Sequence, residues 1–132
     1  MPMTDHVLVD SEISLQNGRA RIDIGLPWFR NLPYSSILDV SLELDGAPIT
    51  VNEIELCVED EYWKIAELAQ FTEQSWFLQD RATIEFPAPA NLGETVDCTV
   101  NLLLLIPNMF MGPDKPLEIP AQVRKQIPVI HL

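Results

Sequence analysis

Apolar and polar residues alternate most clearly between residues 94 and 111, in the stretch ETVDCTVNLLLLIPNMFM. One set of alternate positions is apolar throughout and consists of Val96, Cys98, Val100, Leu102, Leu104 and Ile106. The other set begins polar and becomes apolar at Leu103 and Leu105. This period predicts a strand, and a strand that is apolar on both faces is covered on both faces. One cover is the protein's own core, and we expect the other to be either a returning C-terminal tail or a second protein.

Two hairpins can be predicted together with their register. Asn17-Gly18 is a strong signal for a two-residue type I′ turn. This turn predicts the pairs Gln16–Arg19, Leu15–Ala20, Ile13–Ile22 and Ser11–Ile24, and every apolar residue among them then lies on the same face. Asp45-Gly46 predicts a second turn, with the pairs Leu44–Ala47, Leu42–Ile49 and Val40–Val51, and with Leu38 extending the same face. A slip by one residue would scramble the first pattern, so register and hydrophobic pattern agree.

The segment between the hairpins, residues 26–36, reads LPWFRNLPYSS. Its two prolines exclude a central strand and a helix interior. It nevertheless carries three aromatic residues, Trp28, Phe29 and Tyr34, beside Arg30. Two interpretations stay open. The loop caps one end of the fold with its aromatic rings tucked in, or it exposes an aromatic and arginine patch of the kind that is enriched at interface hot spots.

Shorter elements follow the second hairpin. Residues 53–58 alternate as a strand, residues 62–64 form its return, and the acidic run 59–61 between them predicts a solvated turn because it lacks the spacing of a calcium loop. Residues 65–71 are the one passable helical stretch. Further strands are predicted at residues 76–78 and 82–86.

The last segment, residues 107–132, holds five prolines and many apolar residues. The prolines argue against a regular central strand, and the apolar side chains imply that the segment docks onto something. Short strands with frequent turn signals and almost no helix predict an all-β fold, an antiparallel β-sandwich with an irregular proline-rich C-terminal tail. We therefore expect a sandwich domain over residues 1–106 and a docking tail of the same domain over residues 107–132.

The composition of the chain narrows its partners. The 132 residues carry a net charge of −12 with only eight Lys and Arg, which argues against nucleic acid and against an anionic membrane surface as ligands. No apolar run approaches the about 20 residues of a spanning helix, and the N-terminal residues lack the pattern of a secretory signal. The two cysteines, Cys57 and Cys98, form no disulfide framework. We expect free thiols and a cytoplasmic protein.

Motifs of self-contained chemistry are missing. The two histidines lie near the termini, at positions 6 and 131, and no HExxH or clustered Cys/His pattern predicts a metal site. No GxSxG, GxGxxG or P-loop pattern is found. Glu53, Glu55 and Glu59 alternate on a polar strand face and are expected to be solvated. The sequence therefore predicts no catalytic residue and no metal ligand in this chain, and favours a binding module or an accessory subunit.

A set of weak motifs in a shared order then points to a family. The first motif is an aromatic-Arg-x-Leu/Ile-Pro loop, which matches residues 29–33. A strand then matches residues 37–44, and an Asp-Gly turn with a following proline matches residues 45–48. An acidic return ending in Tyr-Trp matches residues 59–63, and WFLQDRATIEF matches a later segment at residues 76–86. In this order, over residues 22–106, the chain resembles the small beta subunit of bacterial C-glycoside deglycosidases.

The resemblance implies a heteromeric enzyme. In such enzymes a TIM-barrel alpha subunit, related to sugar-phosphate isomerases, carries a divalent metal, usually manganese. It cleaves the carbon–carbon bond between a 3-oxo-glucosyl unit and an aromatic aglycone. The resemblance implies that the beta subunit is a β-sandwich without a cofactor of its own, which packs on the barrel and is needed for an active, soluble complex.

On this basis we expect one group of residues at the subunit contact or near the substrate mouth: Trp28, Phe29, Arg30, Tyr34, Leu103, Leu105, Met109 and Phe110. A first alternative is a free-standing carbohydrate-binding module that stacks sugars on Trp28, Trp63 or Trp76. A second alternative is a homo-oligomeric structural protein. The first alternative predicts that tryptophan fluorescence responds to simple sugars without a second protein. The second alternative predicts a stable homo-oligomer by light scattering, with no ligand present.

Overall fold

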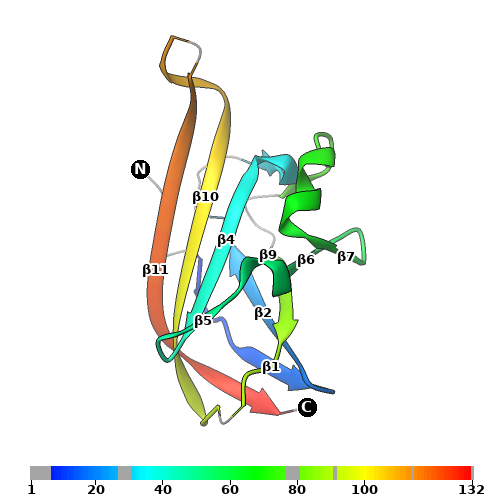
Figure 1. Cartoon of the computed structure of the whole chain (residues 1–132), viewed down its shortest axis with the longest axis vertical. Coiled ribbons are helices and arrows are strands. Elements are labelled where there is room, and N and C mark those ends of the chain that lie inside the picture. Colours follow the sequence, from blue (N-terminus) through cyan, green and yellow to red (C-terminus); the bar gives the residue numbers. More distant parts are fainter. Residues whose placement is uncertain (1–6, 27–30, 77–80, 91, 114, 132) are drawn as a thin grey trace.

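The computed structural model describes residues 7–26, 31–76, 81–90, 92–113 and 115–131, and for residues 107–111 it describes the backbone only. Strands dominate this part of the chain (Figure 1). They are β1 (Ile13–Gln16), β2 (Arg19–Gly25), β3 (Leu32–Pro33), β4 (Ile37–Leu44), β5 (Ala47–Ile49), β6 (Glu55–Val58), β7 (Glu61–Lys64), β8 (Ser75–Trp76), β9 (Arg81–Pro87), β10 (Thr95–Gly112) and β11 (Lys115–His131). Three short 3-10 helices are η2 (Tyr34–Ser36), η3 (Val51–Glu53) and η4 (Ile65–Gln70).

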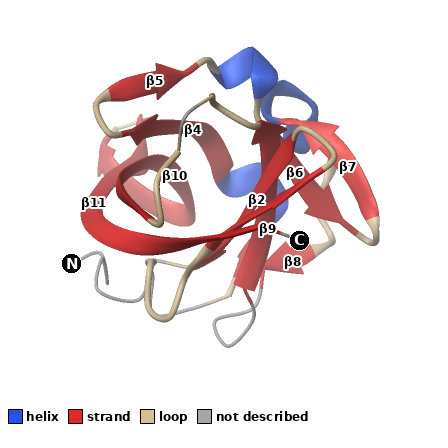
Figure 2. Ribbon diagram, turned by 90° about the horizontal axis from the view of Figure 1, so that it is seen from below, coloured by secondary structure: helices blue, strands red, loops and turns tan. Residues whose placement is uncertain are grey.

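Nine of these strands form one sheet in the order β5-β4-β10-β11-β1-β2-β9-β6-β7, and β3 and β8 form a separate pair. The sheet curls so that its two halves face each other (Figure 2). Strand β11 joins the halves, because it pairs antiparallel with β10 and, at Val129–His131, parallel with β1. The all-β prediction is confirmed. The separate sheets of a sandwich are not, and the parallel pair makes the sheet mixed where the sequence predicted an antiparallel one.

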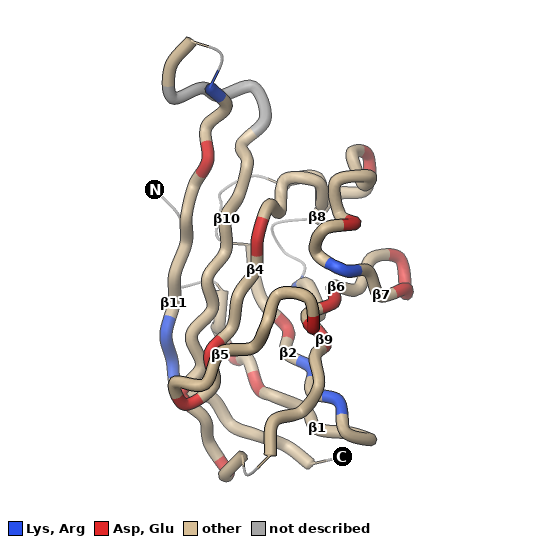
Figure 3. Tube along the Cα trace, in the orientation of Figure 1, with Lys and Arg blue, Asp and Glu red and all other residues tan. Residues whose placement is uncertain are grey.

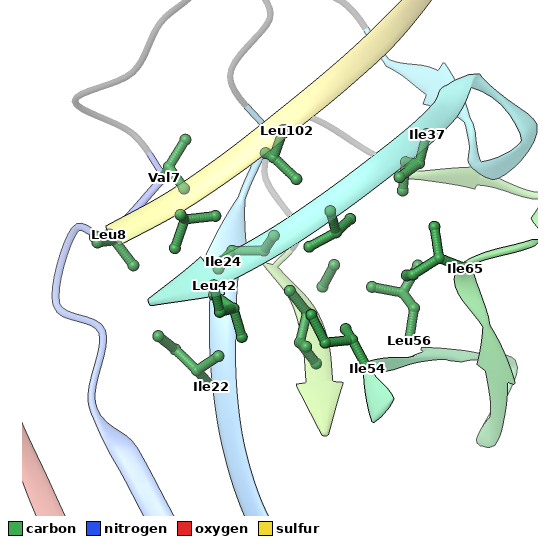
Figure 4. Packing of buried hydrophobic residues seen from close by; sticks show 14 of the residues in the cluster. Val7, Leu8, Ile22, Ile24, Ile37, Leu42, Ile54, Leu56, Ile65 and Leu102 are labelled. Carbon is green, nitrogen blue, oxygen red and sulfur yellow. The ribbon is translucent and has the colours of Figure 1, made fainter. Parts of the chain in front are cut away.

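The core lies between the two halves of the sheet. Leu42 of β4 and Leu102 of β10 point toward Ile22 and Ile24 of β2, and Leu56 of β6 completes the layer (Figure 4). All six apolar residues predicted on the inner face of β10 are buried: Val96, Cys98, Val100, Leu102, Leu104 and Ile106. This burial confirms the inward set of the strand on which the sequence analysis opened, and it stabilises the curled sheet by removing apolar area from water.

Both predicted turns form. Asn17 and Gly18 have positive φ angles, as do Asp45 and Gly46, which is the backbone geometry of a type I′ turn. The first hairpin has the predicted pairs from Gln16–Arg19 to Ile13–Ile22, and the second has Leu44–Ala47 and Leu42–Ile49. The acidic turn is exposed, and its residues Glu59 and Asp60 also have positive φ.

The predicted pairing fails at the outer end of each hairpin. Ser11 lies before β1, where its hydroxyl donates to the carbonyl oxygen of Asp23, and Val51 opens η3 instead of pairing with Val40. Leu38 does not share the face of Leu42. The pairs Leu103–Asp39 and Leu104–Ile37 leave Leu38 as an extra residue in a bulge, which turns Ile37 inward and Leu38 outward.

The expectation of an irregular C-terminal tail is wrong. β10 continues past Ile106, and β11 pairs with it from Lys115 to Pro128. The prolines of β11 fit into the strand because all of them occupy even-numbered positions. The backbone N–H of Val129 donates to the carbonyl oxygen of Glu94 across the ladder at 2.8 Å, and N–H groups alternate between the two sides of a strand. The nitrogens of Pro116, Pro120 and Pro128 therefore point away from β10, so no hydrogen bond of this ladder is lost.

The remaining elements largely follow their predictions. Residues 65–70 form the 3-10 helix η4, in which Ile65 and Leu68 are buried. Cys98 is buried and Cys57 is half-buried, and both thiols are free. None of the helices in the described part of the chain has the length and apolar content needed to span a membrane.

Candidate partner interface

The hairpin of β10 and β11 extends beyond the rest of the sheet. The ladder between β10 and β4 ends at the pair Leu104–Ile37, and farther along β10 pairs with β11 alone. The two strands continue from this point as an arm that projects from the body of the molecule (Figure 1). The backbones of Met109 and Phe110 lie in this arm, and their side chains lie outside the described residues. Within the described part of the chain, the arm is thus the surface that projects farthest from the sheet (Figure 1).

Leu103 and Leu105 lie on the outward face of β10 and are half-buried. Their cross-strand neighbours on this face are Pro120 and Glu118 of β11 and, for Leu103, Asp39 of β4. The C-terminal segment therefore lies beside β10, edge to edge, and does not lie across its outward face. Of the two covers that the sequence analysis allowed for these leucines, the returning tail is wrong. A second protein remains as a prediction.

The bulge of β4 adds a groove next to these leucines. Leu38 is 40% exposed and Val51 is 37% exposed. Both line a cavity of about 450 Å³ together with Asp39, Asn52, Lys64, Ile65, Ala66 and Glu67. The wall is held by two hydrogen bonds, from Lys64 Nζ to the carbonyl oxygen of Asn52 at 2.6 Å and from the Lys64 backbone N–H to Glu67 Oε1 at 2.9 Å. Leu38, Val51, Leu103 and Leu105 are called the outward strip below.

Acidic residues surround the outward strip. Figure 3 shows acidic positions along β4 and β11. Among them, Asp39 is exposed beside Leu103, and Glu118 is exposed beside Leu105. Glu67 adds a further carboxylate at the rim of the groove. Lys64 is the one basic residue among the lining residues; its ammonium group donates to the carbonyl oxygen of Asn52 and is outnumbered by the carboxylates of Asp39, Glu67 and Glu118. The surface therefore combines an apolar centre with a negative rim.

The predicted aromatic loop is described only in part. Trp28, Phe29 and Arg30 lie outside the described residues. Tyr34 is half-buried in η2 and packs against the core, and its backbone N–H donates to the carbonyl oxygen of Gln74 at 3.0 Å. The neighbouring Ser35 N–H donates to the carbonyl oxygen of Phe71 at 3.0 Å, which ties η2 to the end of η4. A contact between this loop and a partner stays a prediction.

Of the three tryptophans proposed as sugar platforms, the two that the structure describes are used for packing. Trp76 is only 1% exposed, so its assignment as a stacking platform is wrong. Trp63 is half-buried and packs edge to face against Phe71, with ring centroids 5.0 Å apart. A platform for a sugar needs an open ring face, and burial of Trp76 in the core removes that face.

Acids and arginines on the opposite half of the sheet form ion pairs. Arg19 contacts Glu85 at 2.8 Å and Glu55 at 2.9 Å, and Arg21 contacts Glu85 at 3.0 Å. Burial of Glu85 acts to raise its pKa, but the hydrogen bonds and charges of both arginines outweigh it and leave the pKa lowered. Glu85 is therefore held as a carboxylate, an arrangement that suits a structural ion pair better than a general acid.

A second groove, of about 470 Å³, lies before β1 and is lined by polar residues. Its central residue is Arg81, whose Nη2 donates to Ser11 Oγ at 2.6 Å and to the carbonyl oxygens of Val7 and Asp23 at 3.2 Å each. These contacts tie the segment before β1 to β2 and β9. Within the residues that the structure describes, no cluster of three or more His, Cys, Asp or Glu is placed to hold a metal ion.

Comparison with known proteins identifies the relatives of this fold. Residues 14–100 match the family model of the C-glycoside deglycosidase beta subunit. The chain belongs to this family. A 3'-dehydrocarminate deglycosidase beta subunit from Microbacterium sp is 29% identical over 126 residues, which cover 96% of this chain and 94% of the relative. A C-glycoside deglycosidase beta subunit from Arthrobacter globiformis is 27% identical over 106 residues, covering 79% of this chain and 80% of the relative.

The matched range, residues 14–100, includes Leu38 and Val51 and ends before Leu103. A beta subunit from Microbacterium trichothecenolyticum, 23% identical over 126 residues, covers 96% of both chains. The family assignment confirms the resemblance seen in the sequence, and a beta subunit implies assembly with another subunit.

Sequence reasoning missed the groove because it placed Leu38 on the inner face. A signal was present. Ile37 and Leu38 are adjacent apolar residues in a strand that otherwise alternates, and such a break in alternation is typical of a bulge. Val51 was missed for a related reason, since it was paired with Val40 as if the hairpin continued.

Proposed function

We propose that this chain is the beta subunit of a heteromeric deglycosidase that cleaves the carbon–carbon bond of 3-oxo-C-glycosides. In this proposal it packs on a TIM-barrel alpha subunit, which carries the catalytic residues and a divalent metal that we expect to be manganese. The family match over residues 14–100 carries the proposal. The name of the Microbacterium sp relative, a 3'-dehydrocarminate deglycosidase beta subunit, supports a dehydrogenated C-glycoside as the substrate class.

The chemistry of a 3-oxo sugar explains why such a complex excludes water. The ketone acidifies the C2–H bond, and a base of the alpha subunit removes this proton to form an enolate. The electron pair then moves into a C1–C2 double bond as the bond from C1 to the aglycone breaks, and the aglycone carbon takes up a proton. A barrel opens its site at the carboxyl ends of its strands, so a subunit that walls this mouth shields the enolate from water.

The test is co-expression with the open reading frame adjacent to this gene. We expect the two chains to purify together, and the complex to release aglycone from a 3-oxo-C-glycoside while neither chain alone does so. Chromatography coupled to light scattering measures the assembly, and absorbance of the freed aglycone measures the reaction. The proposal would be refuted if this chain were active by itself. It would also be refuted if the two chains eluted separately and their mixture were inactive.

A further inference from the structure

Exposed large apolar side chains are concentrated at one place on the described surface. Among the described residues, three large apolar side chains are exposed: Val9 at 42%, Leu38 at 40% and Val51 at 37%. Two of the three, Leu38 and Val51, line the same groove. Leu38 is there because the bulge of β4 turns it out of the sheet, at the position where β4 pairs with Leu103.

The groove and the outward leucines of β10 form one surface. Asp39 belongs to the lining of the groove and is the cross-strand partner of Leu103. Residues directly opposite on adjacent strands have Cβ atoms about 4.5–5.5 Å apart. Leu103 therefore lies at the edge of the groove, and Leu105 follows on the same face two residues along β10. The outward strip thus runs from η3 across the bulge of β4 to the base of the arm.

The acidic residues around the outward strip indicate which kind of protein surface can bind there. Asp39, Glu67 and Glu118 form its rim, and the whole chain carries a net charge of −12. A second copy of this chain would bring the same acids against themselves, which like-charge repulsion opposes. The surface instead fits a different protein that offers apolar side chains ringed by Lys and Arg.

We propose that the outward strip is the docking surface for the alpha subunit, which meets it with an apolar patch inside a basic rim. This inference rests on the function proposed above, and it adds the location and the chemistry of the contact. Apolar side chains at the centre of an interface supply most of the binding free energy, while rim charges steer association and set its salt dependence. The two parts of the strip can therefore be tested separately.

The central test replaces both groove residues in the full chain, Leu38→Asn with Val51→Asn. The matched control is Val9→Asn, the same kind of change at the third exposed apolar residue, which lines the polar groove before β1. All three side chains are exposed, so we expect each variant to keep the far-ultraviolet circular dichroism and melting temperature of the wild type. Isothermal titration with the purified alpha subunit encoded by the adjacent gene should show a Kd raised by about tenfold or more for the double variant. Val9→Asn should leave the Kd within about twofold of the wild type.

A second variant tests the rim. Asp39→Lys with Glu118→Lys reverses two exposed charges that lie beside Leu103 and Leu105. We expect slower association at low ionic strength, and a smaller dependence of the association rate on salt than in the wild type.

The outcomes separate this inference from the proposed function. If the wild type binds the alpha subunit and the groove double variant binds equally well, the location is wrong while the function stands. If the wild type does not bind, the proposed function itself fails. If light scattering shows a wild-type dimer that Leu38→Asn with Val51→Asn abolishes, a second copy occupies the strip and the inference is overturned.

Discussion

Glu85 illustrates how a single residue of the opposite sheet half is fixed in one protonation state. Its side chain is only 13% exposed, and both of its oxygens accept hydrogen bonds, Oε1 from Arg19 and Oε2 from Arg21. Desolvation of the carboxylate is outweighed by these two guanidinium groups, so the pKa of Glu85 lies below its usual value of 4.5. The unfolded chain therefore takes up this proton at a higher pH than the folded chain does.

The lowered pKa predicts how stability depends on pH. Ionised Glu85 stabilises the fold above its unfolded pKa, and this contribution is lost as the pH falls below about 4.5 through the folded pKa. We expect Glu85→Gln to lower the free energy of unfolding by about 1–2 kcal/mol at pH 7, with partial screening because both arginines are partly exposed. Urea denaturation at pH 7 and pH 3 should show the difference from wild type shrinking at the lower pH. Glu61→Gln, at an exposed residue of β7, is the control and should show neither effect.

Leu38 shows at the same scale what sequence reasoning lacks. Alternation assigns each residue of a strand to a face only while the pairing has no irregularity. A bulge shifts the assignment by one residue, and at Leu38 it converted a predicted core residue into an exposed one. Burial of Ile37 in its place keeps the core filled, so the composition of the segment alone does not reveal the change.

Among the elements, β11 combines prolines with a long ladder. Its pairing with β1 covers only Val129–His131, and no other strand in the described part of the chain pairs with its outer edge from Lys115 to Ile127. Pro116 and Pro120 lie on this open edge with their nitrogens outward. An edge strand presents free N–H groups to other chains, and proline removes these donors. The prolines thus protect the arm from adding a further strand.

This protection predicts the behaviour of the variant Pro116→Thr with Pro120→Thr. Both positions are exposed, and the new N–H groups point to solvent, so the fold is kept with a loss of stability of about 1–2 kcal/mol from the freer unfolded chain. We expect concentration-dependent dimers by light scattering, because the edge can now pair with a second copy. Gln122→Thr with Gln126→Thr adds two threonines to the same edge, keeps the prolines and the charged residues, and should not dimerise beyond the wild type. A monomeric proline variant at the highest attainable concentration would contradict this explanation.

The elements also divide into those that sequence can predict and those that it cannot. Asn17-Gly18 and Asp45-Gly46 specify turn geometry locally, so the adjacent strand pairs followed from sequence alone. The parallel pair of β11 with β1 joins residues at opposite ends of the chain, and no local signal encodes it. For β11 itself, the number of prolines suggested an irregular tail. A strand is nevertheless possible, because the prolines occupy even-numbered positions whose nitrogens point away from β10. The projecting arm and the outward strip follow from these long-range pairings, which is why the residues of the groove were missed.

On the scale of the whole molecule, one end of the β10–β11 hairpin contributes to the core and the other end forms the projecting arm. At one end β11 leaves β10 for β1 and joins the two halves of the curled sheet. Ile127 and Val129 are buried there, so this end contributes to the core. At the other end the hairpin projects beyond β4 and its strands pair with each other alone. Stability and partner binding should therefore be separable along one hairpin.

Shortening the arm tests this separation. The hydrogen bond from Val129 N–H to the carbonyl oxygen of Glu94 sets the alternation, so Ile106 and Leu117 form a hydrogen-bonded pair, the kind that a two-residue turn closes. Replacing residues 107–116 by Asn-Gly should keep the free energy of unfolding within about 1 kcal/mol, because the removed strands have no other partner strand in the described sheet. We expect the Kd for the alpha subunit to rise by about tenfold or more, since Met109 and Phe110 are predicted contacts.

A full-length variant distinguishes the length of the arm from its side chains. Met109→Ser with Phe110→Ser keeps the hairpin and removes only the predicted apolar contacts. If both variants lose affinity to a similar degree, the side chains of the arm tip make the contact. If the shortened arm binds weakly while the serine variant binds as the wild type does, the backbone reach of the arm matters and Met109 and Phe110 do not. Full affinity in both variants would place the whole contact on the body of the protein, where the outward strip lies.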